Sequence, residues 1–114
     1  MSTGTSTASS RREQYLRSLD ADGRIPTDSG KDLVDEIGQL VFVTVRLDSL
    51  SPAVGGVCYA TISGLDDTGK AVMVLDAEDH AAALEWMSRG SADLIGQATT
   101  LFGQPGLDLR RVNG

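Results

Sequence analysis

The chain has 114 residues, 40% of them hydrophobic and 23% charged, which suits one globular domain with a single modest core. Its formal net charge of −6 argues against strong nonspecific binding of nucleic acid and against a polybasic membrane anchor, while leaving room for a local basic groove. One cysteine, Cys58, excludes an internal disulfide and fits a reducing, cytoplasmic compartment. No apolar run approaches the ~20 residues of a membrane span.

The beginning of the chain is predicted to be a tail followed by a short helix. Residues 1–10 are rich in Ser and Thr and have no apolar core, so we expect a disordered tail and not a signal peptide. Tyr15, Leu16 and Leu19 then stand at helical spacing, which predicts a helix over residues 11–19.

A second helix is predicted after a break at residues 20–26. Thr27 or Asp28 is the expected cap, and the helix ends at about Ile37 because a glycine follows. The chain is therefore expected to divide into a disordered tail at 1–10, a helical arm at 11–37 and a barrel at 38–114.

The hydrophobic period changes from helical to two at Leu40, which predicts strands. One face of the first strand is expected to be formed by Val41, Val43, Val45 and Leu47. After a loop at 48–56, further strands are predicted at 57–63 and 70–75. Between them, Gly64–Gly69 has the composition of a tight turn, since Gly accepts positive φ and Asp bonds its own backbone.

A helix and two more strands are predicted to complete the chain. Ala81–Met87 is rich in Ala, the best helix former, and Asp79 is a candidate cap. Trp86 and Met87 are expected to pack on the core, and Gly90 to end the helix. The remaining elements are expected to be a strand at 94–101, a turn at 103–106 and a strand at 107–112.

This order of three strands, a helix and two strands resembles the OB-fold family of small Greek-key barrels, over residues 38–112. Gly64-Leu65-Asp66-Asp67-Thr68-Gly69, leading into an apolar strand, is similar to the L-x-D-x-T-G hairpin of nucleic-acid-binding OB domains. Arg89–Ala98 is similar to the G-x-x-x-x-x-x-G start of the fourth strand, and Leu107–Val112 to the closing strand. The resemblance implies a five-stranded barrel, with the helix at its bottom.

The resemblance also implies a binding face on strands two and three, flanked by the loops that join strands one to two and four to five. Aromatic side chains there would stack on bases, and cations would follow the backbone. The candidate nucleic-acid-binding residues are Arg46, Tyr59, Lys70, Phe102, Arg110 and Arg111. Tyr59 has a second interpretation, as core or edge packing. Four carboxylates in or beside the same region would repel phosphate, namely Asp48, Asp66, Asp67 and Asp108.

No enzyme, metal or cofactor site is predicted. Asp79 and His80 are adjacent in a first helical turn and point in different directions, with no nucleophile. Cys58 lies mid-strand, where a buried inert thiol is expected. Residues 66–70 lack the glycines of a P-loop, and the segment around residues 20–25 lacks the bidentate Glu of a calcium loop.

Two functions follow from the sequence. The first is an accessory module that binds single-stranded nucleic acid. The alternative is an acidic protein-interaction or assembly subunit, with homo-oligomers through the arm or a barrel edge, and neither involves a membrane. A positive groove with exposed Tyr59 and Phe102 would favour nucleic acid, whereas an apolar or acidic face would favour a protein partner.

Overall fold

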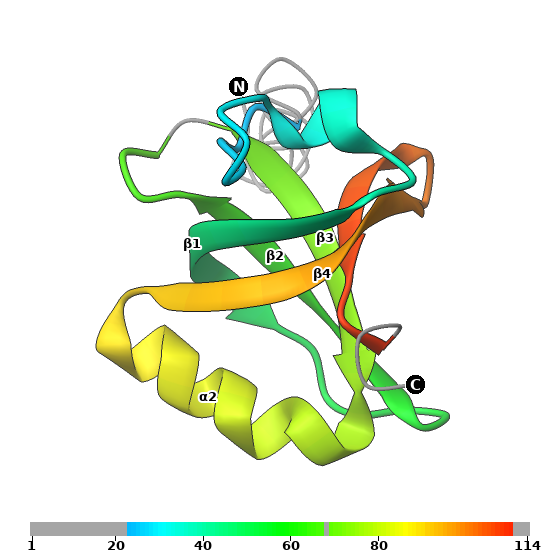
Figure 1. Ribbon diagram of the computed structural model, residues 1–114. Helices are drawn as coiled ribbons and strands as arrows, with labels where there is room; N and C mark the ends of the chain where they lie inside the picture. The colour runs from blue at the N-terminus through cyan, green and yellow to red at the C-terminus, as the bar shows by residue number, and fades with distance from the viewer. Residues whose placement is uncertain (1–22, 68, 111–114) are drawn as a thin grey trace, which may run out of the picture.

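The computed structural model describes residues 23–67 and 69–110. They form a closed barrel of five strands with one α-helix across one end (Figure 1). In chain order the elements are η1 (Leu33–Glu36), β1 (Leu40–Leu50), β2 (Val57–Gly64), β3 (Lys70–Asp76), η2 (Ala77–Asp79), α2 (His80–Arg89), β4 (Ala92–Leu101) and β5 (Gln104–Asp108). The predicted barrel, with a helix between its third and fourth strands, is confirmed.

The barrel closes in the strand order β1-β2-β3-β5-β4. β1, β2 and β3 form an antiparallel meander, and β4 pairs antiparallel with both β1 and β5. The closing contact is the parallel pair of β3 and β5, in which Val72 lies opposite Gly106 and Val74 opposite Asp108. β1 runs to Leu50 through an irregularity between Leu47 and Ser49, so it is longer than predicted.

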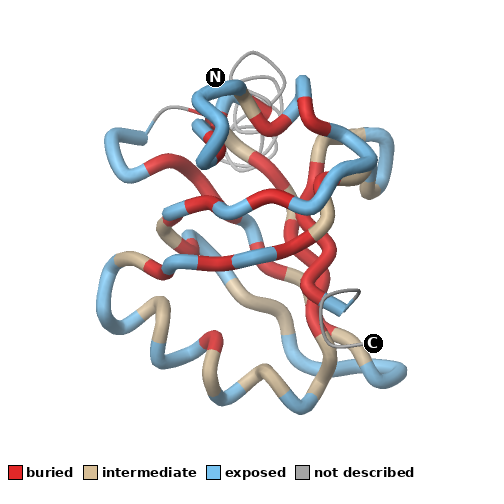
Figure 2. The backbone as a smooth tube through the Cα atoms, viewed as in Figure 1, coloured by how far each residue is buried: buried red, intermediate tan, exposed pale blue. Residues whose placement is uncertain are grey.

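The core is built by the alternation of side chains along the strands. Successive strand residues point to opposite faces, so every second residue of β1 as far as Leu47 enters the barrel. Buried positions alternate with exposed or half-buried ones along much of the strand backbone in Figure 2. The predicted inner face of β1 is confirmed by the burial of Val41, Val43, Val45 and Leu47.

Helix α2 covers one end of the barrel (Figure 1). Ala83 is buried, and Trp86 and Met87 pack against the core as predicted. Gly90 ends the helix in the left-handed conformation, and its N–H reaches the carbonyls of the last turn. Asp79 occupies the N-cap position without a side-chain cap bond. Among the described residues, no helix has the length and apolar character to cross a membrane.

The arm segment, defined here as residues 23–39, closes the end of the barrel opposite α2 (Figure 1). Ile25 and Leu33 are fully buried in the core. The helix predicted from Thr27 or Asp28 to Ile37 is wrong, except for the single 3-10 turn at Leu33–Glu36.

The reason for this difference is that the arm segment pairs with β1. The N–H of Asp28 donates to the carbonyl of Phe42 at 2.9 Å, and Thr27 forms an isolated bridge to Val43. A second bridge, between Pro26 and Asp32, folds the segment back on itself. Tertiary pairing has therefore replaced local helix formation. The helix predicted at residues 11–19 lies outside the described residues.

The last strand begins earlier than predicted. The turn expected at 103–106 is a two-residue turn, because Leu101 pairs with Gln104. Phe102 and Gly103 both have positive φ, of 54° and 76°, which is the pattern of a type I′ hairpin turn. The strand predicted at 107–112 is wrong in its boundaries, since β5 spans Gln104–Asp108.

Candidate binding sites

Four charged residues on the outer surface of β1–β3 form a group that we call the charge cluster: Arg46, Asp48, Asp67 and Lys70. Arg46 Nε lies 3.0 Å from Asp48 Oδ1, and its Nη2 lies 2.5 Å from Asp67 Oδ1. Lys70 Nζ is 3.4 Å from Asp48 Oδ2 and 3.7 Å from Asp67 Oδ1. The structure therefore brings two of the predicted cations together and gives each of them two carboxylate partners.

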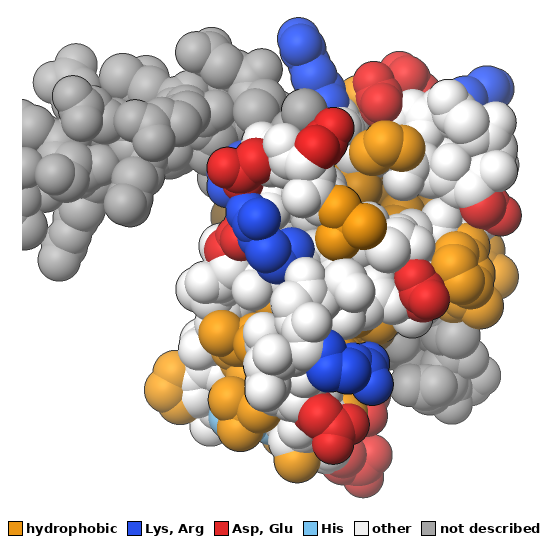
Figure 3. Space-filling model, turned by 90° about the vertical axis from the view of Figure 1, so that its left-hand side faces the viewer, with side chains coloured by type: hydrophobic (Ala, Val, Ile, Leu, Met, Phe, Trp, Pro, Cys, Tyr) orange, Lys and Arg blue, Asp and Glu red, His pale blue; other side chains and the backbone are white. Residues whose placement is uncertain are grey.

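The charge cluster is neutral as a unit. The hydrogen bond to Asp48 is the main cause of a raised pKa at Arg46, followed by the hydrogen bond to Asp67. The hydrogen bond from Arg46 in turn lowers the pKa of Asp67. A phosphate would have to compete with both carboxylates for these cations. On the face drawn in Figure 3, basic and acidic side chains likewise lie close to one another.

A second group contains the predicted aromatic residues. The rings of Tyr59 and Phe102 meet edge to face, with centroids 5.1 Å apart and planes at 63°. Phe102 is 71% exposed, although large apolar side chains at positive φ are uncommon. The type I′ turn lifts Phe102 out of the sheet and sets it against Tyr59 of β2. These two residues are therefore joined as one aromatic surface.

Arg110 is held by the buried carboxylate of Asp108. Arg110 Nε and Nη2 donate to the two carboxylate oxygens at 3.1 and 3.2 Å, and its backbone N–H donates at 2.9 Å. The hydrogen bond to Asp108 is the first cause of the raised pKa at Arg110, and the nearby Tyr59 adds to it. Arg111 lies outside the described residues. All three cations that were predicted within the described residues thus have aspartate partners.

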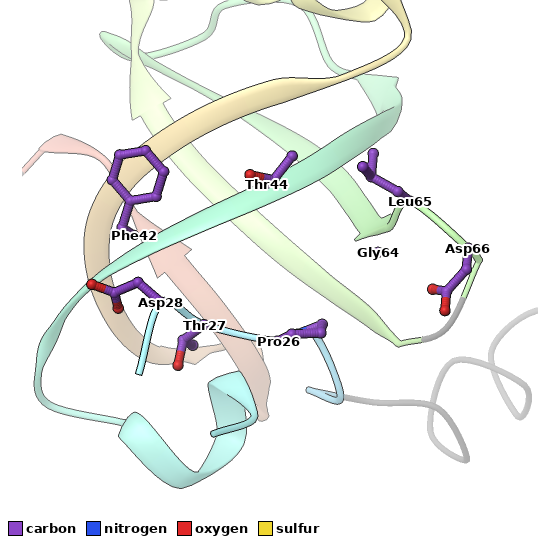
Figure 4. A pocket seen from close by; sticks show the side chains of 8 residues that line it. All are labelled: Pro26, Thr27, Asp28, Phe42, Thr44, Gly64, Leu65 and Asp66. Atoms are coloured by element: carbon purple, nitrogen blue, oxygen red, sulfur yellow. The ribbon is translucent and has the colours of Figure 1, made fainter. Parts of the chain in front are cut away.

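A third surface, which the sequence did not predict, is a hollow of about 480 Å³ that we call the groove. Its lining residues are Pro26, Thr27, Asp28, Phe42, Thr44, Gly64, Leu65 and Asp66. Figure 4 shows Phe42 and Thr44 rising from β1, with the arm segment along one side and the β2–β3 turn at one end. The groove is therefore formed by three segments that are far apart in the sequence.

Each end of the groove combines an apolar side chain with a carboxylate, since Phe42 lies on the side of Asp28 and Leu65 on the side of Asp66 (Figure 4). Phe42 is 40% exposed and Leu65 54% exposed, while the carboxylates of Asp28 and Asp66 lie among the lining side chains. Phe42 occupies an outward position of β1 and lies opposite the exposed Ile95 of β4. Large apolar side chains at outward strand positions are the sequence signal that would have indicated this surface.

The polar lining is fixed by short hydrogen bonds. Thr44 Oγ1 donates to Asp93 Oδ1 of β4 at 2.6 Å. Thr27 Oγ1 donates to the carbonyl of Lys31 at 2.8 Å and lies 3.0 Å from Ser29 Oγ. These contacts hold both walls of the groove in place, so it is formed before any ligand arrives.

The residues considered for catalysis have structural contacts. His80 Nε2 lies 3.2 Å from the carbonyl of Ser51, which joins α2 to the β1–β2 loop. Cys58 is fully buried, and burial is the main cause of the raised pKa of its thiol, with the charges of Asp79 and Asp76 adding to it. Within residues 23–67 and 69–110, no three His, Cys, Asp or Glu side chains gather as metal ligands.

Comparison with family models, with curated proteins and with solved structures finds no match to this chain. Its function is therefore argued from the geometry of its own surfaces.

Proposed function

We propose that this protein is a protein-interaction module that binds a basic peptide segment of its partner in the groove. The observation that carries the proposal is the combination of exposed Phe42 and Leu65 with the carboxylates of Asp28 and Asp66 in one hollow. Apolar side chains of the partner would be buried against Phe42 and Leu65. Lys or Arg side chains beside them would face the carboxylates.

The charge distribution supports a protein ligand over nucleic acid. The chain carries 16 acidic and 10 basic residues, and the cations of the charge cluster are neutralised by aspartates. Acidic surfaces attract basic partners and slow the approach of polyanions. Because salt screens this attraction between opposite charges, we expect the association rate to be higher at low salt.

The size of the groove sets the expected affinity. A hollow of about 480 Å³ has room for a few side chains of a partner. The surface area buried by such a contact is well below the ~1,200 Å² that a stable protein–protein interface buries. The complex should therefore be weak and reversible, with a dissociation constant on the order of micromolar.

Panning a phage-displayed library of random peptides against the whole chain tests this function. We expect enriched peptides to combine Lys or Arg with an aromatic or aliphatic anchor. Their fluorescence anisotropy should report binding to the wild type that Phe42→Ser weakens by about tenfold or more, since an anchor of this kind is worth ~1.4 kcal/mol or more. Leu84→Ser, which changes an exposed apolar residue on α2, is the matched control and should bind as the wild type does. Enriched peptides that bind Phe42→Ser unchanged would overturn the proposal. So would a library without enriched basic peptides both on the wild type and on a full-length chain carrying Leu16→Ser and Leu19→Ser.

A second candidate function is single-strand nucleic-acid binding at the aromatic surface. It is favoured by the exposed ring of Phe102 against Tyr59, with Arg110 close by. A base would stack on Phe102. The test is a salt titration of labelled single strands on the wild type and on Phe102→Ser. Binding that is lost in Phe102→Ser and kept in Phe42→Ser would support this function, and no binding at low salt would reject it.

A further inference from the structure

We infer that the chain's own segment of residues 11–19 occupies the groove and competes there with partner peptides. This inference rests on the proposed function, because it assigns an internal competitor to the same site. The point where the chain enters the barrel, the reach of the segment and its side chains support the assignment.

The chain enters the described structure beside the groove. The N–H of Gly23 donates to the carbonyl of Lys70 at 2.8 Å, at the base of the β2–β3 turn. The next residue, Arg24, packs so closely on Gly69 that a Cβ there would lie 2.6 Å from the carbonyl carbon of Arg24. The same β2–β3 turn supplies Leu65 and Asp66 to the groove. The segment therefore joins the barrel at a turn that forms one end of the groove.

The connection is short. Leu19 precedes Gly23 by four residues, which span at most ~14 Å when fully extended. On the other side of Gly23, Pro26 is already a lining residue of the groove. A segment tethered this closely reaches an effective concentration on the order of millimolar. A micromolar site would then be filled by its own chain in most molecules.

The side chains of the segment complement the groove. Tyr15, Leu16 and Leu19 share one side at helical spacing and would be buried against Phe42 and Leu65. The cations of the segment are Arg11, Arg12 and Arg17. They would face the carboxylates at the ends of the groove. An amphipathic helix laid into an apolar groove is a recurrent mode of peptide recognition.

The test uses full-length proteins and one probe, a labelled synthetic peptide with the sequence of residues 9–20. In the wild type the tethered segment should exclude the probe. Leu16→Ser combined with Leu19→Ser disables the tethered segment, so we expect the probe to bind this variant at least about tenfold more tightly. Gln14→Ser is the matched control, because helical spacing puts Gln14 outside the stripe of Tyr15, Leu16 and Leu19, and it should bind the probe as weakly as the wild type. Adding Phe42→Ser to the double variant should abolish the gain.

Three results would overturn the assignment of the segment to the groove of its own chain. Equal binding of the probe to the wild type and the double variant would overturn the inference, and so would failure of the probe to bind either protein. The library peptides would still bind through Phe42 in both cases, which separates this failure from failure of the proposed function. A dimer in analytical ultracentrifugation that Leu16→Ser dissociates would place the segment in a second copy and overturn the intramolecular assignment. Because docking of the segment stabilises the folded chain, the double variant should also have a lower thermal midpoint than the wild type, while Gln14→Ser should not, and equal midpoints of the wild type and the double variant would count against the inference.

Discussion

The two tight turns of the sheet have similar backbone requirements and very different surroundings. The β2–β3 turn places Asp67 at φ 69° and Gly69 at φ 83°, and the β4–β5 turn places Phe102 at 54° and Gly103 at 76°. A Cβ on Gly69 would clash with the backbone of the arm segment, whereas a Cβ on Gly103 would meet nothing within 4 Å. The first turn is a junction between barrel and arm, and the second displays one aromatic ring to solvent.

This difference shows why composition alone does not assign a role to a turn. Both turns contain residues at positive φ, yet of these two turns only the β2–β3 turn contributes to the groove and fixes the arm segment. Alanine at Gly69 and at Gly103 introduces a Cβ at positive φ in both turns, but only at Gly69 does this Cβ meet neighbouring atoms. The difference in lost stability therefore separates backbone strain from packing.

Gly69→Ala should have the largest effect. Strain at positive φ and a contact of 2.6 Å with Arg24 act together, so we expect a loss of about 3 kcal/mol in the free energy of unfolding. Urea denaturation measures the loss. The arm segment should also be displaced, which increased proteolysis near Arg24 would report. A loss below about 1 kcal/mol would mean that the arm segment gives way easily.

Gly103→Ala is the matched comparison. Its Cβ has open space, so only the unfavourable φ remains, and we expect a loss of about 1 kcal/mol. The same urea denaturation applies. If the two alanine variants lost equal stability, the contrast between a packed turn and a free turn would be broken.

Phe102→Asn should slightly stabilise the barrel. Asn is favoured at positive φ in type I′ turns, and the largely exposed ring loses only a partial contact with Tyr59, so we expect a gain of about 0.5 kcal/mol. In a Tyr59→Leu background the gain should be larger, because no ring pair is lost. A clear loss of stability would show that the aromatic pair outweighs the strain.

Asp67→Asn should have the smallest effect and a defined pH dependence. The pKa of Asp67 is lowered in the folded state, chiefly by its hydrogen bond from Arg46. Its carboxylate therefore stabilises the fold above its unfolded pKa of about 3.9, and this contribution is lost as the pH falls through the lower folded value. The thermal midpoint of the variant should be slightly below that of the wild type at pH 7, with the gap closing as the pH falls through the lowered pKa of Asp67 in the folded state. A gap that widened in acid would contradict this assignment.

The sequence predicted the regular part of the barrel well, because alternation along β1, β2 and β3 is a local signal. It failed where tertiary contacts decide the conformation. Gly103–Gly106 has the composition of a turn, but the chain reverses one residue earlier, at Phe102 and Gly103, which both have positive φ. Gln104 is therefore already a strand residue. Residues 27–37 have helix signals, but pairing with Phe42 and Val43 replaces most of the predicted helix.

The sites were predicted unevenly for the same reason. The aspartates expected beside the predicted cations include three that form direct ion pairs with Arg46, Lys70 or Arg110, while repulsion of phosphate stays a prediction. The groove was missed because its walls come from the arm segment, β1 and the β2–β3 turn, which only the folded chain brings together. Nucleic-acid binding and membership of the OB-fold family stay predictions.

The pairing of β1 with β4 has a consequence for how the chain folds. Leu40 lies opposite Gln97 and Val45 opposite Ala92, so closure of the barrel waits for strands near the end of the described chain. During synthesis on the ribosome, the β1–β2–β3 meander would emerge first, with both outer edges unpaired. Pairing of strands that are far apart in the sequence slows folding. Until it is complete, the unpaired strand edges can aggregate or bind chaperones. The closed barrel thus protects in its finished form a sheet that is vulnerable to aggregation while it is being made.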